Sequence, residues 1–156
     1  MIEVNIPGRE QLTINHVVLD YNGTMAVDGH LLPGVAEKLN ELSALLTIHI
    51  LTADTFGKVR SECHNINGII TVLPPGAGAE AKRQYITRLG RHEVAAIGNG
   101  YNDHLMLESA ALGILVMEEE GVSVRSLQNA DVVVKSIHHA LDLLLKPQRL
   151  IATLRN

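Results

Sequence analysis

Short apolar runs alternate with longer segments of helical spacing along most of the chain. The runs are rich in Val, Ile and Leu and end at glycine, proline or polar residues, which is typical of buried parallel strands. Strands that alternate with helices predict an α/β three-layer sandwich, a Rossmann-like, mainly parallel sheet with right-handed crossovers and helices on both faces. The predicted strands are 17–20, 47–51, 69–73, 93–97, 113–117 and 131–134, and the helices between them are 35–46, 56–64, 79–89, 102–111 and 122–129.

Two further segments flank this alternation. Residues 1–20 alternate apolar and polar side chains on both sides of Pro7-Gly8, which predicts a β-hairpin arm whose first strand is an antiparallel edge. The C-terminal segment has helical spacing that is interrupted at Lys146-Pro147. The chain has 156 residues without a linker or an internal repeat, so we expect a single domain, 1–156.

Composition excludes several classes of protein. The chain is 46% hydrophobic and 19% charged, with three Tyr, one Phe and no Trp, so we expect a compact fold with an aliphatic core. The net charge is −4 and there is no basic run, which gives no reason to expect nucleic-acid binding. One cysteine, Cys63, excludes an intrachain disulfide and fits a reducing compartment. No signal pattern or membrane-length apolar run is present, so we expect no membrane association and a cytoplasmic location.

Polar side chains follow successive predicted strands. Asp20 ends the first, Thr52 ends the second, Lys82 lies early in the helix after the third, and 99–103 (Asn-Gly-Tyr-Asn-Asp) follows the fourth. Ligands of open parallel sheets bind beyond the carboxyl ends of the strands, so these side chains are expected to converge. Singly, each has an ordinary interpretation: Lys82 as a solvated lysine, and Asn102, like Asp54, as a helix cap.

As an ordered set, these residues favour phosphoryl transfer. A carboxylate can attack phosphorus and carry the phosphoryl group. A hydroxyl and backbone N–H groups can hold the phosphoryl oxygens, an ammonium can offset their charge, and Mg²⁺ can bridge carboxylate and phosphate. Read as a dinucleotide fingerprint, the Gly-x-Gly at 98–100 fails because it follows the fourth strand rather than the first.

The four motifs together resemble the haloacid dehalogenase (HAD) superfamily. They read apolar-apolar-apolar-Asp-x-x-Gly-Thr, then apolar-apolar-Thr, then Lys, then Gly-x-Gly-x-Asn-Asp-x-x-Met-Leu, over residues 17 to 114. Gly98–Asp103 with Met106-Leu107 is similar to the hinge motif in the phosphorylation domain of P-type ATPases. The chain lacks the membrane spans and nucleotide-binding insert of such a pump, so it resembles a soluble relative of that domain.

The resemblance implies a role for each matched position. Asp20 would be the phosphorylated nucleophile, Thr52 would bind the phosphoryl group and Lys82 would neutralise it, with Asn22 at the position of the general acid. The same resemblance implies a Mg²⁺-dependent phosphohydrolase. The remaining expected contacts are to substrate (Gly23, Thr24, Thr52, Ala53, Lys82, Asn102) and to Mg²⁺ (Asp20, the Asn22 backbone carbonyl, Asn99, and Asp103 directly or through water).

Two departures from the pattern modify this expectation. Most phosphatases of the superfamily have aspartate at the position of Asn22. The motif that Gly98–Asp103 resembles normally has a Mg²⁺-binding aspartate at the position of Asn99. An amide cannot exchange a proton at useful pH, and such catalysis is typically worth ~10²–10⁴-fold. The site would also bind Mg²⁺ less tightly because it carries two fewer negative charges. We therefore expect slow turnover that favours acyl or aryl phosphates or a nucleotide; the alternative is a non-hydrolytic phosphate-binding or regulatory module.

Access to the site is expected to be open. Residues 25–33 leave room for only a short flap and not for a cap domain, so a phosphorylated small molecule or a macromolecule could be the substrate. An apolar stripe near the C-terminus could form a homo-oligomer interface, or could pack on the chain's own sheet. Its residues are Leu143, Leu144, Leu145, Leu150 and Ile151. His104 is expected at the rim of the site. A response-regulator receiver domain shares the fold class but needs an acidic pair near its first strand, which this chain lacks.

Overall fold

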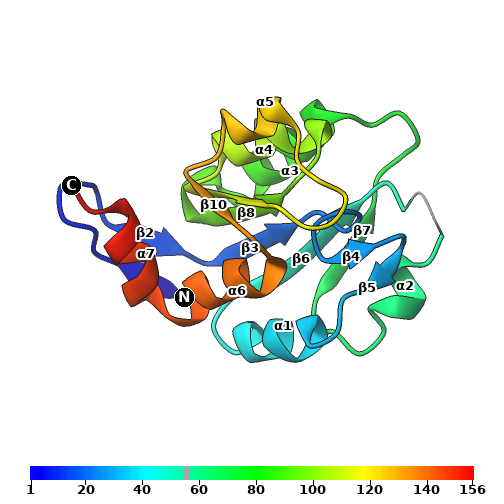
Figure 1. Cartoon of the computed structure of the whole chain (residues 1–156), viewed down its shortest axis with the longest axis horizontal. Coiled ribbons are helices and arrows are strands. Elements are labelled where there is room, and N and C mark those ends of the chain that lie inside the picture. The colour runs from blue at the N-terminus through cyan, green and yellow to red at the C-terminus, as the bar shows by residue number, and fades with distance from the viewer. Residues whose placement is uncertain (55–56) are drawn as a thin grey trace.

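A six-stranded parallel sheet forms the centre of the protein, whose computed structural model describes residues 1–54 and 57–156 (Figure 1). The sheet order is β10-β9-β8-β3-β6-β7, and every neighbouring pair is parallel. The predicted fold class is therefore confirmed. The strands are β3 (His16–Leu19), β6 (Thr47–Thr52), β7 (Ile69–Val72), β8 (Val94–Gly98), β9 (Leu112–Val116) and β10 (Val132–Val134).

Strand β3 lies in the middle of this sheet. It pairs with β6 on one side and β8 on the other, and Leu19 is in register with Ile50 and Ile97. From β3 the chain adds β6 and then β7 on one side. It then returns to the other side of β3, where it adds β8, β9 and β10 in turn. Strand order thus reverses beside β3, and such a switch point is where open α/β sheets bind ligands.

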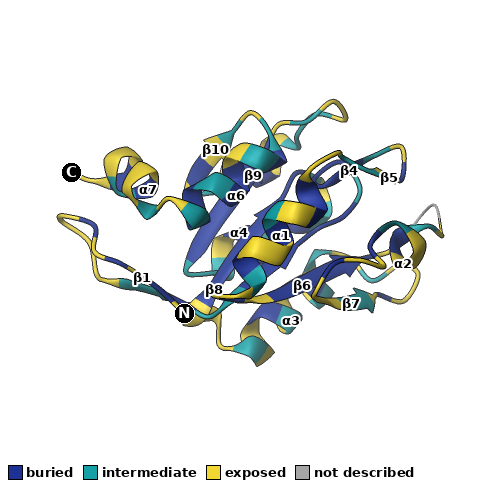
Figure 2. Ribbon diagram, turned by 90° about the horizontal axis from the view of Figure 1, so that it is seen from below, coloured by how far each residue is buried: buried dark blue, intermediate teal, exposed yellow. Residues whose placement is uncertain are grey.

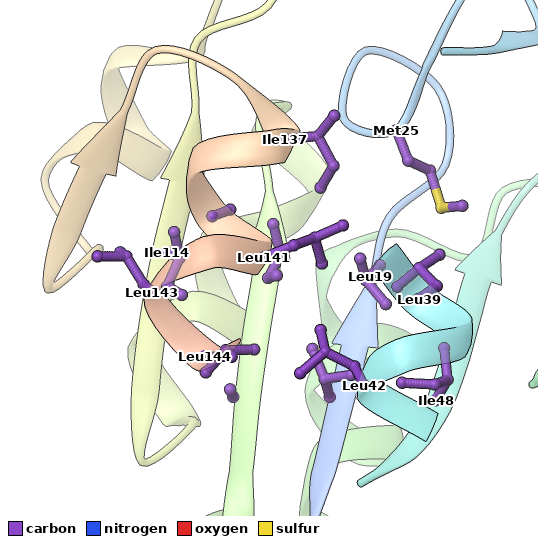
Figure 3. Close-up of a cluster of buried hydrophobic side chains, with 14 of the residues drawn as sticks. Leu19, Met25, Leu39, Leu42, Ile48, Ile114, Ile137, Leu141, Leu143 and Leu144 are labelled. Carbon is purple, nitrogen blue, oxygen red and sulfur yellow. The ribbon is translucent and has the colours of Figure 1, made fainter. Parts of the chain in front are cut away.

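Helices cover both faces of the sheet (Figure 1). One face carries α1 (Val35–Ser43) and α6 (Ile137–Leu145), which is followed by α7 (Pro147–Leu154); the other carries α3 (Ala79–Leu89), α4 (His104–Ser109) and α5 (Val124–Leu127). Burial follows these layers, because the inner strands are buried after their first residues and the helices are exposed on their outer sides (Figure 2). The aliphatic core expected from composition packs between α1, α6 and the sheet, as the labelled leucines in Figure 3 show.

Two small hairpins complete the fold. Strands β1 (Ile2–Val4) and β2 (Leu12–Ile14) pair only with each other, so the predicted hairpin is confirmed but forms a separate two-stranded sheet and is not an edge of the central one. Its alternate side chains are buried against the main core, which holds it in place without strand pairing. The second hairpin, here called the flap, joins β4 (Ala26–Val27) and β5 (His30–Leu31) through a tight turn at Asp28-Gly29.

Several predicted helices are shorter in the structure. The helix expected over 56–64 is α2 (Val59–Glu62), and its predicted start at Phe56 lies outside the described residues. The helix expected over 102–111 begins as a 3₁₀ turn, η2 (Tyr101–Asp103), and continues as α4; a second 3₁₀ turn, η1 (Arg91–Glu93), precedes β8. Helix α1 ends before Leu45, whose side chain is exposed. Boundaries differ in this way because apolar spacing does not mark where helical hydrogen bonding stops.

The C-terminal leucines belong to the core of the chain. Helices α6 and α7 meet at Lys146-Pro147, as the sequence predicts, and Leu143, Leu144 and Leu150 are buried. Of the two interpretations of this stripe, the structure supports packing on the chain's own sheet (Figure 3). In the described part of the chain, no helix has the length and apolar character needed to cross a membrane.

Candidate active site

Asp20 lies at the carboxyl end of the central strand. Its backbone N–H continues the ladder by donating to the Ile97 carbonyl oxygen at 2.9 Å, and the residue is 6% exposed. The three residues before it, Val17, Val18 and Leu19, are fully buried between the two helix layers. A strand paired on both sides therefore delivers one carboxylate to the switch point of the sheet.

Lys82 reaches the same point from the first turn of α3. It is fully buried, and its Nζ donates to Asp20 Oδ1 at 2.6 Å and to Asp103 Oδ1 at 2.7 Å. Burial disfavours the ammonium, but the two carboxylates outweigh it, and the pKa of Lys82 lies above its ordinary value. Lys82 is thus a charged bridge between two strand ends, and the ordinary interpretation as a solvated lysine is wrong.

Asp103 closes the other side of this bridge. Its Oδ2 accepts the backbone N–H groups of Asn99 and Gly100 at 3.0 and 2.9 Å, so the carboxylate holds the turn between β8 and η2. Gly98 makes this approach feasible, since a Cβ atom there would lie 2.6 Å from the Asp103 carboxylate. Both oxygens of Asp103 are engaged by donors of this chain.

The electrostatics of the site follow from burial. Desolvation of the carboxylate, and then repulsion from Asp103, raise the pKa of Asp20 to about 7, although Lys82 favours the ionised form. One ammonium does not fully compensate two buried carboxylates. The site therefore has a surplus of negative charge that a cation would relieve.

Thr24 and Asn99 form a second polar pair beside Asp20. The Thr24 hydroxyl is fully buried and lies 3.4 Å from Asp20 Oδ2 and 3.1 Å from Asn99 Oδ1. The Nδ2 atom of Asn99 donates to the Gly121 carbonyl oxygen at 3.0 Å. These contacts orient the amide so that its oxygen faces the carboxylate side of the site.

Thr52 occupies the end of β6. It is 1% exposed, and its hydroxyl oxygen accepts the backbone N–H of Asp54 at 2.9 Å. The hydroxyl hydrogen is not used by this bond and stays free to donate. Asp54 Oδ1 accepts the N–H groups of Lys58 and Val59 at the start of α2, which confirms its interpretation as a cap.

Asn22 leaves one polar atom without a partner. Its Oδ1 is buried and accepts no hydrogen bond from the described residues. Asp20, Asn22 and Asn99, which follow β3 and β8, carry carboxylate and amide oxygens of the kind that Mg²⁺ prefers. Among the described residues, no three His, Cys, Asp or Glu side chains are grouped to hold a metal.

Several solved structures are similar to this chain in fold. A protein from Legionella pneumophila, described as a HAD superfamily hydrolase of subfamily III A, matches 90% of this chain and 87% of its own at a TM-score of 0.71 and 17% identity. The second is the 3-deoxy-D-manno-octulosonate 8-phosphate phosphatase of Moraxella catarrhalis, in complex with magnesium, phosphate and KDO. The match covers 91% of this chain and 94% of that protein, with a TM-score of 0.68 and 18% identity. The third is the cobalt-bound phosphatase of the same type from Haemophilus influenzae. The match covers 88% of this chain and 90% of that protein, with a TM-score of 0.66 and 12% identity.

This chain has the HAD fold.

Sequence relatives include short archaeal proteins. The uncharacterized protein MJ0073 of Methanocaldococcus jannaschii is 50% identical over 64 residues, which are 41% of this chain and 69% of that protein. MJ0072 of the same organism is 49% identical over 39 residues, 25% of this chain and 89% of that protein. The chain belongs to one family with these two proteins. No protein-family model matches it.

The P-type resemblance also has a counterpart. The phospholipid-transporting ATPase tat-1 of Caenorhabditis elegans is 31% identical over 101 residues, which are 63% of this chain and 8% of the ATPase. The chain thus spans a small part of that relative's length.

On the HAD fold, the structure brings together Asp20, Thr24, Lys82, Asn99 and Asp103 by direct contacts. Two expected substrate residues are less engaged. Ala53 is exposed, and Asn102 is half-buried with no side-chain cap on α4. The cap expected of Asn102 is therefore absent, because the carboxylate of its neighbour Asp103 holds that turn instead.

His104 is not a rim residue. It is 8% exposed, and its ring Nδ1 contacts the Tyr101 carbonyl oxygen at 2.6 Å, so this first-turn histidine packs inward. Tyr101, two positions after Asn99, is exposed instead. Tyr101 begins the 3₁₀ turn η2 and His104 begins α4, and their ring centroids lie 4.9 Å apart, so the exposed tyrosine ring packs on the buried histidine.

Two residues near the site were not singled out from the sequence. Glu120 and Gly121 follow β9 and approach the loop after β3: Gly121 accepts from Asn99, and Glu120 Oε1 accepts the backbone N–H of Asp28 in the flap at 3.0 Å. The signal available was Glu118-Glu119-Glu120 directly after a predicted strand, at the same edge of the sheet as Asp20.

The larger of the two cavities described by the structure lies away from this edge. It has a volume of about 630 Å³ and opens between α3 and α4. The cavity shares helix α3 with the site, but Lys82 points to the opposite side of that helix, into the core. Its lining residues are Glu80, Arg83, Gln84, Thr87, Arg88, Arg91, Leu105, Glu108 and Ser109.

Proposed function

We propose that this protein is a divalent-metal-dependent phosphohydrolase that carries the phosphoryl group on Asp20. The observation that supports it most is the buried Asp20 carboxylate, bridged to Asp103 by Lys82 at the switch point of a HAD fold. A phosphatase with the same fold binds magnesium and phosphate. Sequence, geometry and fold similarity thus point to the same chemistry.

The proposed reaction has two displacements at phosphorus. In the first, an Asp20 carboxylate oxygen attacks phosphorus, the bond from phosphorus to the leaving oxygen breaks, and an aspartyl phosphate forms. In the second, water attacks that phosphorus, which returns the carboxylate and releases inorganic phosphate. Lys82 would offset the charge on the phosphoryl oxygens, and the free hydroxyl hydrogen of Thr52 would donate to one of them.

A divalent cation, Mg²⁺ in our proposal, would be held by oxygens of Asp20, Asn22 and Asn99. Asp103 would contribute through water, since both its oxygens already accept hydrogen bonds from the chain. When bound, the ion would neutralise the phosphoryl oxygens and polarise the bond to the leaving oxygen. The surplus negative charge that raises the pKa of Asp20 would favour its binding.

Asn22 determines the expected substrate preference. Its amide cannot supply a proton to a leaving alkoxide, so good leaving groups such as acyl or aryl phosphates, or the terminal phosphate of a nucleotide, would react fastest. The flap has two strands of two residues each, and it is the element beside Asp20 in place of a cap. A phosphorylated small molecule or a macromolecule could therefore approach.

A second candidate function is phosphate binding without turnover. The amides at Asn22 and Asn99, and an Asp103 whose oxygens are both engaged, favour it. The two functions differ in one observable, the release of inorganic phosphate.

The deciding experiment measures phosphate release from acetyl phosphate and 4-nitrophenyl phosphate with Mg²⁺ and with EDTA. Wild-type protein should release phosphate only with the metal, and acetyl phosphate should leave a hydroxylamine-sensitive phosphoryl label on the protein. Asp20→Asn should remove both signals because the amide is not a nucleophile.

Asp28→Asn is the matched control, since it removes an exposed carboxylate in the flap and should leave both signals unchanged. Release that survives Asp20→Asn would contradict the proposal. A wild-type protein that binds phosphate but shows neither label nor release at high Mg²⁺ would establish the second candidate.

A further inference from the structure

The Asn99 amide occupies a position that accepts an amide and disfavours a carboxylate. Its Oδ1 accepts from the Thr24 hydroxyl at 3.1 Å, while its Nδ2 donates to the Gly121 carbonyl oxygen at 3.0 Å. An aspartate here would place an anionic oxygen against that carbonyl, with no hydrogen between them. The loop after β9 is therefore matched to asparagine, which is not simply an aspartate that has been lost.

The same loop brings a carboxylate to the Asn99 side chain. If Gly23 carried a Cβ atom, Glu120 Oε2 would lie 2.9 Å from it, and the Asn99 amide would lie at least as near. The two side chains therefore meet over Gly23, which has a φ of 77° and can be only glycine without displacing them. Glu120 Oε1 is fixed separately by the Asp28 N–H of the flap at 3.0 Å.

We propose that Glu120 supplies the negative charge that position 99 lacks, as a positioning residue for the divalent cation. This inference rests on the proposed function. One oxygen of Glu120 is anchored in the flap, and the other lies over Gly23 on the side of the Asn99 Nδ2 atom, opposite the amide oxygen, so the carboxylate would act at a distance through the ion's bound water and not as a direct ligand. The unpartnered Oδ1 of Asn22 lies in the same loop as Gly23 and offers a neutral ligand there.

The charges of the site give such a residue a role. Of the carboxylates at the site, Asp20 and Asp103, both are paired with Lys82, and Asn22 and Asn99 are neutral. A third carboxylate beside Asn99 would add to the attraction that the surplus negative charge of Asp20 and Asp103 gives a dication. Outer-shell partners of metal ligands typically change affinity by about 10–100-fold when they are removed.

The test measures the dissociation constants of Mg²⁺ and Mn²⁺ by calorimetry, with no substrate present. Glu120→Gln should weaken binding about 10-fold or more, because the charge is lost while the amide oxygen can still accept from Asp28 N–H. Glu119→Gln removes the same charge from the adjacent exposed residue and should change affinity less than about 2-fold at 0.15 M salt. Thermal unfolding of both apo variants should match wild type.

The outcomes separate this inference from the proposed function. Wild-type protein that binds the ion, together with equal affinities for Glu120→Gln and Glu119→Gln, would overturn the role of Glu120 alone. Wild-type protein that binds no divalent ion would overturn the metal dependence of the proposed function itself. A Glu120→Gln variant that loses affinity only together with folding stability would assign Glu120 to holding the flap and would also overturn the inference.

Discussion

The ammonium of Lys82 lies 2.6 Å from a carboxylate oxygen of Asp20, although 62 positions separate them in sequence. Both side chains are buried, so removing either leaves the other uncompensated. Lys82→Met should lower the free energy of unfolding by about 3–5 kcal/mol, the usual cost of breaking a buried pair on one side. Chemical denaturation of the apoprotein measures it.

A double variant makes this prediction specific. In an Asp20→Asn background, Lys82→Met leaves only Asp103 uncompensated, so its cost should be smaller. Lys135→Met, at an exposed lysine, should change stability by less than about 0.5 kcal/mol. Equal costs in the two backgrounds would show that the Lys82–Asp20 contact is not energetically coupled.

Asn22→Asp should increase the turnover of poor leaving groups. The substitution exchanges the Asn22 side-chain NH₂ group for an oxygen and retains Oδ1, which has no partner among the described residues. A protonated aspartate there can donate to the leaving oxygen, which is worth up to about 10²–10⁴-fold. The measurement is the ratio of alkyl to aryl phosphate hydrolysis, which should rise; an unchanged ratio would remove Asn22 from the proton-transfer position.

Asn99→Asp should tighten metal binding and weaken the apoprotein. The added charge attracts the cation, but the hydrogen bond to the Gly121 carbonyl oxygen is lost and replaced by repulsion. We expect the apoprotein to lose about 1–3 kcal/mol of unfolding free energy. Calorimetry with Mg²⁺ and denaturation without it measure the two effects; a variant as stable as wild type would mean that the Gly121 contact does not select an amide.

A histidine pair on the α3 side of the sheet should make stability depend on pH. His49 is 3% exposed; its Nε2 lies 3.1 Å from His16 Nδ1, and its Nδ1 lies 3.0 Å from the Tyr85 hydroxyl. Burial, and then the neighbouring His16, lower the pKa of His49 to about 4. The folded protein therefore binds fewer protons than the unfolded chain between pH 6.5 and 4, so stability falls as the pH falls through this range.

From pH 7 to 5, the expected loss from His49 is about 2 kcal/mol of unfolding free energy. Denaturation curves at a series of pH values measure it. His49→Gln keeps a polar side chain and should flatten the dependence, whereas His139→Gln, at an exposed position, should retain the wild-type slope. Equal slopes for these two variants would place the pH dependence elsewhere.

Much of the site could be predicted because it follows strands. Asp20, Thr52 and Asn99 are each set at the end of an apolar run, and parallel strand ends must share one edge. Contacts made by loops could not be predicted in this way. That Gly121 would orient Asn99, or Glu120 would anchor the flap, depends on how the chain turns after β9, and apolar spacing carries no information about that path.

In the fold, too, local patterns could be predicted from the sequence and long-range contacts could not. The six strands follow from short apolar runs and α3 from helical spacing, and the α3 boundaries agree because Gly90 ends the helix with a φ of 91°. The hairpin of β1 and β2 has a clear alternation, but alternation does not state which sheet a strand joins. Its detachment from the central sheet depends on burial against the core, a long-range effect.

The position of β3 between two neighbours has a consequence for how the protein opens. Amide hydrogens of Val17, Val18 and Leu19 lie in fully buried backbone paired on both sides, so their exchange with solvent should require unfolding of the whole domain. The flap has only two paired residues in each strand and should exchange through brief local opening. Asp20 would then remain fixed while the flap opens many times in the lifetime of one folded molecule.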